Sequence, residues 1–135
     1  MNKYIWKGIL DKYKASATLK AAIPRMYLIE APQEKIEQRG AYPYCVVIPI
    51  ASDKEYTFTE AADNLQVQFS IYDDDDTVAT INDAADKLKA VFDFASITVT
   101  GYNHICMQQE YSELMHEDKY WHQVIVYNLI IQKTR

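Results

Sequence analysis

The chain has 135 residues, of which 49% are hydrophobic and 24% charged, the size and composition of a single domain spanning residues 1–135. This apolar content excludes an intrinsically disordered chain, and the lack of any apolar run of about 18 residues excludes a spanning helix. Fourteen Lys and Arg against nineteen Asp and Glu give a net charge of −5 without a basic block, so we expect neither specific nucleic-acid binding nor membrane association. The first residues lack a signal-peptide apolar stretch, and we expect the chain to stay in the cytoplasm.

The beginning of the chain predicts a helix and then a short strand. Apolar residues recur at four-residue spacing in residues 3–17, which is typical of a helix. Gly8 inside this helix costs about 1 kcal/mol relative to Ala, so it indicates a packing requirement or a frayed first turn. Residues 18–23 predict one more helical turn, which Pro24 ends, and residues 25–29 predict a short strand.

The middle of the chain predicts three extended segments. Residues 43–50 have the unbroken β-branched character of a strand that is buried on both faces. Pro43 and Pro49 lack an N–H donor, so we expect them at the ends of this strand or at a sheet edge. Residues 52–63 predict a second strand or an extended β-arm, and residues 65–72 alternate strictly, which predicts a strand with one buried face.

A second helix is predicted over residues 77–92, whose apolar positions form a single stripe. Asp83 and Lys87 have the spacing of an exposed ion pair on this helix. The acidic run 73–76 lacks the glycine and the alternation of a calcium loop. We therefore expect one of these aspartates, or Thr77, to cap the helix N-terminus.

The last part of the chain predicts a long β-hairpin. Residues 97–100 predict a brief strand, and residues 103–114 and 120–133 predict the two arms of the hairpin. The last arm is apolar on both faces. The order of elements predicts an α+β fold with a mostly antiparallel sheet, two main helices packed on one face, and the long C-terminal β-hairpin.

The residues that could carry chemistry form weak constellations. Cys45 and Cys106 have no CxxC spacing and are expected to be reduced and buried. His116 and His122 flank the hairpin turn and could approach one another on facing strands, but two imidazoles make a poor metal site. His104 and Cys106 share a strand face, without a visible orienting group or oxyanion hole. The three isolated glycines provide no phosphate cradle. Because each of these constellations is weak, we expect no catalytic, metal or cofactor site and no enzyme activity.

Aromatic residues gather around the most apolar strand and the segment that follows it. Among the eleven tyrosines and four phenylalanines, this group consists of Tyr42, Tyr44, Tyr56 and Phe58. Such rings either pack on the core or form a protein–protein interface made by sheet edges and aromatic arms. Both interpretations stay open, and we take these four residues as the candidate interface.

Several stretches, in this order, resemble the tail completion or tail terminator proteins of long-tailed bacteriophages. They are Leu19-Lys20-Ala21-Ala22-Ile23, Arg25-Met26-Tyr27 with Ala31-Pro32, Tyr42-Pro43-Tyr44 running into Val46-Val47-Ile48, and Leu65-Gln66-Val67-Gln68-Phe69-Ser70-Ile71-Tyr72. The helix at residues 81–92 resembles the amphipathic helix that follows in this family, and the final hairpin is similar by pattern only. The resemblance covers roughly two-thirds of the chain and rests on the order of elements more than on rare residues.

The resemblance implies a structural protein of a phage or prophage. It implies a homo-oligomeric ring, commonly a hexamer, that caps the tail tube and joins the tail to the head, with the major tail tube protein and head connector proteins as partners. Its expected location is the virion tail, and the host cytoplasm during assembly. In a closed ring, one surface of each subunit contacts a different surface of its neighbour, and we expect the 30–42 loop and the 53–63 arm to make this contact. DNA passes through the lumen of such a ring, and a net negative charge would keep the DNA from adhering.

Two alternatives belong to other functional classes. The first is a small α+β ligand-binding or regulatory module with a pocket between the sheet and the helices. The second is a thiol- or histidine-dependent enzyme, for which Cys106 is the candidate nucleophile.

Overall fold

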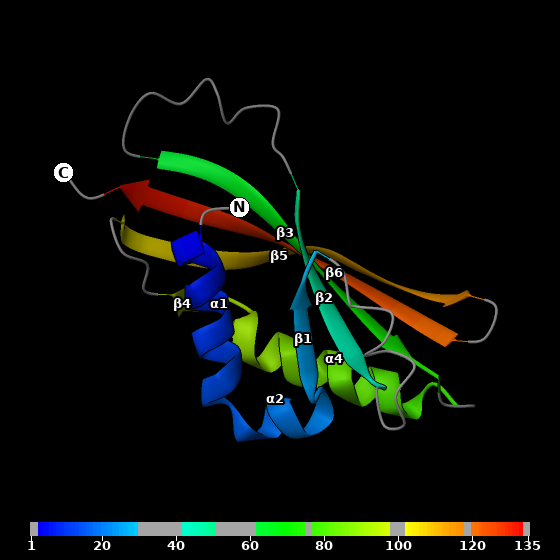
Figure 1. Ribbon diagram of the computed structural model, residues 1–135. Coiled ribbons are helices and arrows are strands. Elements are labelled where there is room, and N and C mark those ends of the chain that lie inside the picture. Colours follow the sequence, from blue (N-terminus) through cyan, green and yellow to red (C-terminus); the bar gives the residue numbers. More distant parts are fainter. Residues whose placement is uncertain are drawn as a thin grey trace.

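The computed structural model describes residues 3–29, 42–50, 62–74, 77–97, 102–117 and 120–133. These residues form helices and strands in the following chain order (Figure 1): α1 (Lys3–Ala15), α2 (Ala17–Ala22), β1 (Arg25–Leu28), β2 (Tyr44–Ile50), β3 (Ala62–Asp73), α4 (Ala79–Phe92), β4 (Ser96–Ile97), β5 (Tyr102–Glu117) and β6 (Tyr120–Lys133). None of the helices in this described part is both long and apolar enough to cross a membrane.

One sheet organises the molecule. The described strands lie in the order β1-β2-β3-β6-β5-β4, and every pair is antiparallel except β1 and β2, which run parallel. Figure 1 shows a twisted sheet with α1, α2 and α4 grouped on one side of it. The α+β class and the mostly antiparallel sheet are therefore confirmed.

The C-terminal hairpin is longer than its sequence pattern predicts. β5 and β6 pair from Glu117 and Tyr120 at the turn back to Tyr102 and Lys133. The predicted first arm ended at residue 114, because the residues that follow are polar and resemble a turn. In the structure they continue the ladder beside β6.

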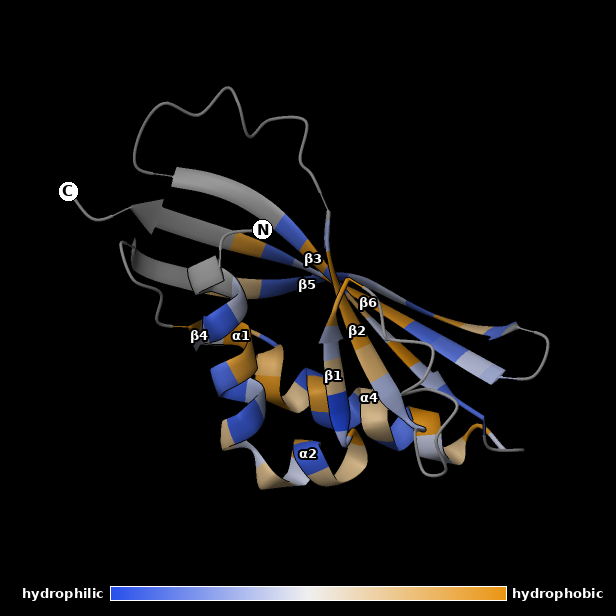
Figure 2. Ribbon diagram, viewed as in Figure 1, coloured by the Kyte–Doolittle hydropathy of each residue, from blue (hydrophilic) through white to orange (hydrophobic). Residues whose placement is uncertain are grey.

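The core lies between the helices and one face of the sheet, and the two periodicities of the sequence explain it. On each strand every second side chain points into this core, and on each helix the side chains of one apolar stripe point into it. Figure 2 shows hydrophobic and hydrophilic residues alternating along α1 and α4. The core contains, among others, Ile9, Leu19, Val47, Val67, Phe69, Ile81, Leu88, Phe92, Ile125, Tyr127 and Leu129.

Pro49 lies inside β2, where its missing N–H is tolerated for a geometric reason. Residues i and i+2 of a strand direct their backbone polar groups to the same side. The carbonyl of Val47 faces β1, because it accepts a hydrogen bond of 2.8 Å from the N–H of Ile29. Pro49 therefore also faces the side of β1, which ends at Leu28, so no described strand needs its donor. Pro43 directly precedes β2, as expected.

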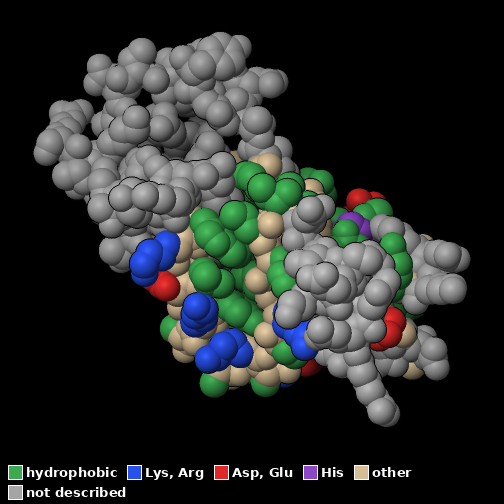
Figure 3. Space-filling model, viewed as in Figure 1, with side chains coloured by type: hydrophobic (Ala, Val, Ile, Leu, Met, Phe, Trp, Pro, Cys, Tyr) green, Lys and Arg blue, Asp and Glu red, His purple; other side chains and the backbone are tan. Residues whose placement is uncertain are grey.

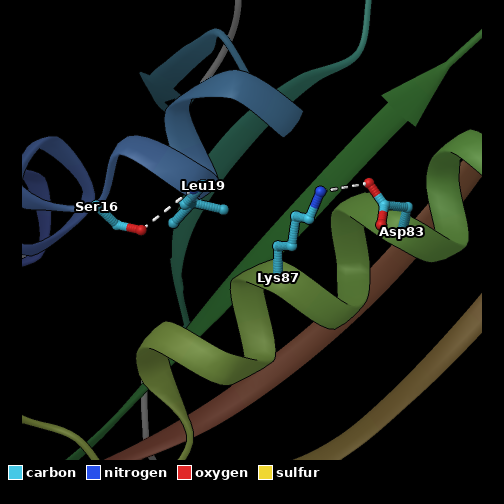
Figure 4. A network of polar contacts seen from close by, with 4 residues as sticks. All are labelled: Ser16, Leu19, Asp83 and Lys87. Atoms are coloured by element: carbon cyan, nitrogen blue, oxygen red, sulfur yellow. Dashed lines mark hydrogen bonds and ion pairs between the residues drawn. The ribbon is translucent and has the colours of Figure 1, made fainter.

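Two polar contacts on the helices are shown in Figure 4. The Ser16 hydroxyl accepts a hydrogen bond of 3.1 Å from the N–H of Leu19 and caps α2. The predicted pair between Asp83 and Lys87 is confirmed at 2.9 Å. The predicted cap of the second helix is wrong: α4 begins after Val78, which makes no side-chain cap hydrogen bond.

Candidate protein–protein interface on the helix-free sheet face

The candidate site lies on the face of the sheet that carries no described helix, which we call the helix-free face. Its side chains alternate with those of the core along each strand. Val124 and Val126 of β6 belong to this face, and they are buried, as are Ile125 and Tyr127 on the core face. The prediction that the last strand is apolar on both faces is thus confirmed.

Six rings form a continuous aromatic row across this face. They come from β1, β2, β3 and β6, and from the residue that precedes Pro43. The ring centroids lie 6.1 Å apart for Tyr27–Tyr44, 5.2 Å for Tyr42–Tyr44 and for Tyr44–Tyr72, 5.7 Å for Tyr72–Tyr120, and 4.3 Å for Tyr72–His122. We call Tyr27, Tyr42, Tyr44, Tyr72, Tyr120 and His122 the aromatic row.

The strand register creates this row. Tyr44 lies opposite Tyr72 in the β2–β3 pair, and Tyr72 lies opposite His122 in the β3–β6 pair. Facing side chains on one sheet face are close enough for direct ring contact, and such pairs contribute about 0.5–1.5 kcal/mol beyond their buried area. The stacked geometry of Tyr72 against Tyr44 and against His122 fits this arrangement. The row is therefore a continuous series of ring contacts that crosses four strands of the sheet.

Burial affects the hydroxyls of two tyrosines of the row. It raises the pKa of Tyr44 above its ordinary value, with smaller contributions from the neighbouring tyrosines. The pKa of Tyr42 is also raised, first by burial and then by the carboxylate of Asp74 and by Tyr120. A phenol whose pKa is raised is a poorer proton donor, so Tyr42 and Tyr44 are suited to contact and hydrogen bonding more than to acid–base chemistry.

A polar row on the same face adjoins the apolar part. The side-chain amide of Gln66 donates to Asn128 at 2.9 Å, and Asn128 donates to the carboxylate of Glu110 at 2.5 Å. These contacts connect β3, β6 and β5. The helix-free face thus carries aromatic rings at one end and amides with a carboxylate at the other.

The structure includes two of the four predicted interface residues in the aromatic row. Tyr42 is half-buried, and Tyr44 is only 7% exposed, so most of Tyr44 already packs within the chain. Tyr56 and Phe58 lie outside the described residues, as do most of the predicted 53–63 arm and nearly all of the predicted 30–42 loop.

The sequence interpretation missed four members of the row. Tyr27, Tyr72, Tyr120 and His122 lie on three other strands, and only the register brings them to one face. Tyr27 and Tyr72 occupy the more polar phase of their strands, which is a signal that could have found them. Tyr120 and His122 lie on a strand that is apolar on both faces, so its pattern gives no such signal.

Among the candidates for catalysis whose side chains the structure describes, Cys45, His116 and His122 are not brought together. Cys45 is fully buried and burial raises the pKa of its thiol, which disfavours the reactive thiolate. His116 lies opposite Trp121 and His122 opposite Met115, so the two histidines point to opposite faces of the hairpin. Within the described part of the chain, no three His, Cys, Asp or Glu side chains converge as metal ligands would. Both cysteines are free thiols, and Cys106 is half-buried.

A shallow groove lies between α1 and β4. It has a volume of about 270 Å³ and is lined by Gly8, Asp11, Lys12, Ala15, Ser96 and Ile97. Gly8 is buried there, which agrees with a packing requirement at this position of the helix. The groove is smaller than the clefts of roughly 300–1,000 Å³ that enclose small molecules.

Comparison with known proteins identifies the fold through structure. No family model matches the chain, and no curated protein sequence matches it. Eight solved chains match by structure. One of them belongs to the virion of a native gene transfer agent particle, with a TM-score of 0.78 and 15% identity over 93% of this chain and 92% of that chain. Another has a TM-score of 0.65 and 13% identity over 96% and 97% of the two chains.

Proposed function

We propose that this protein is a non-enzymatic structural component of a phage or prophage virion, which assembles into a ring, caps the tail tube and joins the tail to the head. The likeness of nearly the whole chain to a chain of a virion particle carries this proposal. The resemblance to tail terminator proteins also supports the proposal, because it rests on the order of elements predicted from the sequence and not on the coordinates. The proposed partners are further copies of this chain, the major tail tube protein and the head connector proteins.

The surface of the molecule is consistent with assembly. Tyrosine is enriched at protein interfaces, since its ring supplies contact area while its hydroxyl tolerates partial exposure. Four of the five tyrosines of the aromatic row are half-buried and keep part of their surface for a partner. We propose that Tyr42, beside the buried Tyr44, contacts another subunit or the tube, and that Tyr56 and Phe58 extend this contact.

The proposed function is tested by adding the purified protein to tail tube protein while the tube polymerises. We expect the protein to bind tube ends and to stop elongation at substoichiometric amounts, because a ring is needed only at an end. Electron microscopy of tube lengths and of their ends measures both effects. Tubes that grow equally long with and without the protein, and that bear nothing at their ends, contradict the proposal.

The contribution of the aromatic row is tested with Tyr42→Ala. The matched control is Phe94→Ala, which also removes an aromatic side chain, one that is 79% exposed and lies outside the row. We expect Tyr42→Ala to weaken assembly at least about tenfold, the effect of losing roughly 1.4 kcal/mol, while the control assembles normally. Circular dichroism of both variants verifies that the fold is intact. Equal assembly by the two variants contradicts a role for Tyr42.

A further inference from the structure

We propose that β1 of one copy pairs with residues 111–117 of β5 in the next copy, so that the sheet continues from subunit to subunit around the ring. We call residues 111–117 the free segment of β5. This inference rests on the proposed ring and names the surface that closes it. The occupant of the β5 edge is a second copy of this chain, whose residues Arg25–Leu28 form the added strand.

The first observation concerns the two ends of the sheet. β1 is the first strand in the described order. β4 pairs with β5 at Ile105 and Cys106, and the carbonyl of Ala95 just before β4 accepts a hydrogen bond of 2.9 Å from the N–H of Met107. A bulge between Gln109 and Tyr111 follows, and residues 111–117 then continue with β6 on one side and no described strand on the other. An unpaired strand edge presents backbone donors and acceptors to which another strand can bind.

The free segment of β5 is accessible and partly apolar. Tyr111 is 50% exposed and Leu114 is 37% exposed, and these are two of the four large hydrophobic residues described as exposed in this structure. Glu113 between them is exposed as well. This segment of seven residues is long enough to accommodate the four residues of β1.

The segment that contains β1 is basic, and Arg25 is the basic residue of β1 itself. Residues 3–29, which form α1, α2 and β1, contain six Lys and Arg and a single Asp. Figure 3 shows a band of hydrophobic side chains flanked by Lys and Arg in this region. Trp6, Leu10 and Met26 of these elements are half-buried apolar residues packed at the border of the core.

Charge distinguishes the two edges. In contrast to the basic N-terminal segment, β5 contains three Glu and neither Lys nor Arg. A heterologous contact joins two different surfaces, and opposite charges favour this pairing over a contact between two identical edges.

Strand direction and register also agree with the proposal. β1 runs parallel to β2, whereas β5 runs opposite to it through the alternating pairs β2–β3, β3–β6 and β6–β5. The next copy's β1 therefore lies antiparallel to β5. One row of facing residues already runs Arg25, Tyr44, Tyr72, His122, Met115 across the sheet. If this row continues at the same level into the next copy, Arg25 of that copy lies opposite Met115. Glu113 is then the diagonal neighbour of Arg25 on the same face.

The test reverses the charge at each edge. We expect Arg25→Glu and Glu113→Arg each to raise the dissociation constant of the ring by about tenfold or more, and the double variant to recover assembly. Asp86→Arg, at an exposed position of α4, is the matched control and should assemble like the wild type. Sedimentation velocity measures assembly, and circular dichroism verifies that each variant is folded.

Hydrogen exchange locates the contact directly. Backbone amides of residues 111–117 and 25–28 should exchange at least about tenfold more slowly in the assembled wild type than in the Glu113→Arg monomer, while those of α4 should not change. If the wild type and both edge variants all form rings, and the amides of β5 exchange no more slowly in the ring, the edge pairing is overturned while the proposed function stands. Rings that persist in the edge variants but no longer bind tubes assign the β5 edge to another protein and also overturn it. A wild type that forms no ring contradicts the proposed function itself.

Discussion

The hydroxyl of Tyr127 donates a hydrogen bond of 2.5 Å to the carboxylate of Asp93 and so ties the centre of the sheet to the end of α4. Tyr127 is fully buried, and Asp93 is the C-cap residue of the helix. Burial, followed by this contact with Asp93, raises the pKa of Tyr127 above its ordinary value. The contact fixes where the helix stops relative to the strand beneath it.

Tyr127→Phe should lower the free energy of unfolding by about 1.5–3 kcal/mol, because a hydrogen bond to a charged acceptor is lost while the ring stays in place. Urea denaturation measures this difference. Asp93→Asn keeps an acceptor for the hydroxyl and serves as the milder control. An unchanged denaturation midpoint for Tyr127→Phe would show that the contact does not stabilise the fold.

Phe94 follows this C-cap in a left-handed conformation, with φ of 56°, and its side chain is 79% exposed. Glycine adopts this conformation without the steric cost of a Cβ atom. Phe94→Gly should therefore raise the free energy of unfolding by about 0.5–1 kcal/mol, since little buried surface is lost. Phe94→Ala keeps the Cβ atom and should show no such gain. If the glycine variant is instead less stable than the alanine variant, backbone strain at this residue is not what limits stability.

Ser16 caps α2 through its hydroxyl. Ser16→Ala should destabilise the protein by about 1 kcal/mol, because the N–H of Leu19 loses its acceptor. Ser16→Asp restores an acceptor and should recover most of the loss. Thermal denaturation followed by circular dichroism measures all three proteins, and equal midpoints for the wild type and Ser16→Ala contradict the role of the cap.

Tyr13 makes stability depend on alkaline pH. Burial raises its pKa from 10.0 to about 12, and its hydroxyl donates a 2.5 Å hydrogen bond to the carbonyl of Ile23. Above pH 10 the unfolded chain loses this proton while the folded chain retains it, so its contribution to stability is complete below pH 10 and declines as pH rises toward 12. The full decline from this residue is about 2 to 3 kcal/mol.

The wild type and Tyr13→Phe should therefore differ most below pH 10 and converge toward pH 12. Denaturation by urea at several pH values measures the difference. Because the other buried tyrosines are present in both proteins, the comparison isolates Tyr13. A difference that stays constant from pH 8 to pH 12 contradicts the raised pKa.

Local patterns were sufficient to predict much of the fold. The strict alternation of residues 65–72 placed one side of β3 in the core, and the apolar stripe of α4 required a single buried face. The apolar character of both faces of β6 was also evident. These features depend on neighbours along the chain, and the sequence displays them directly.

The candidate site depended on information that a single sequence does not display. The aromatic row arises because Tyr44, Tyr72 and His122 share one level of the sheet, and this level is set by pairing between strands that are distant in the chain. The parallel pairing of β1 with β2 likewise depends on tertiary contacts. The cap of α4 was predicted wrongly because several polar residues precede the helix, and their order does not tell which one begins it.

The mass of the purified protein at micromolar concentration, measured by sedimentation velocity and native mass spectrometry, tests the central claim most directly. The proposal predicts one closed species with a fixed number of copies, a hexamer by the resemblance to tail terminators, which electron microscopy resolves as a ring. A protein that stays monomeric at every concentration, and also in the presence of tail tubes, contradicts it.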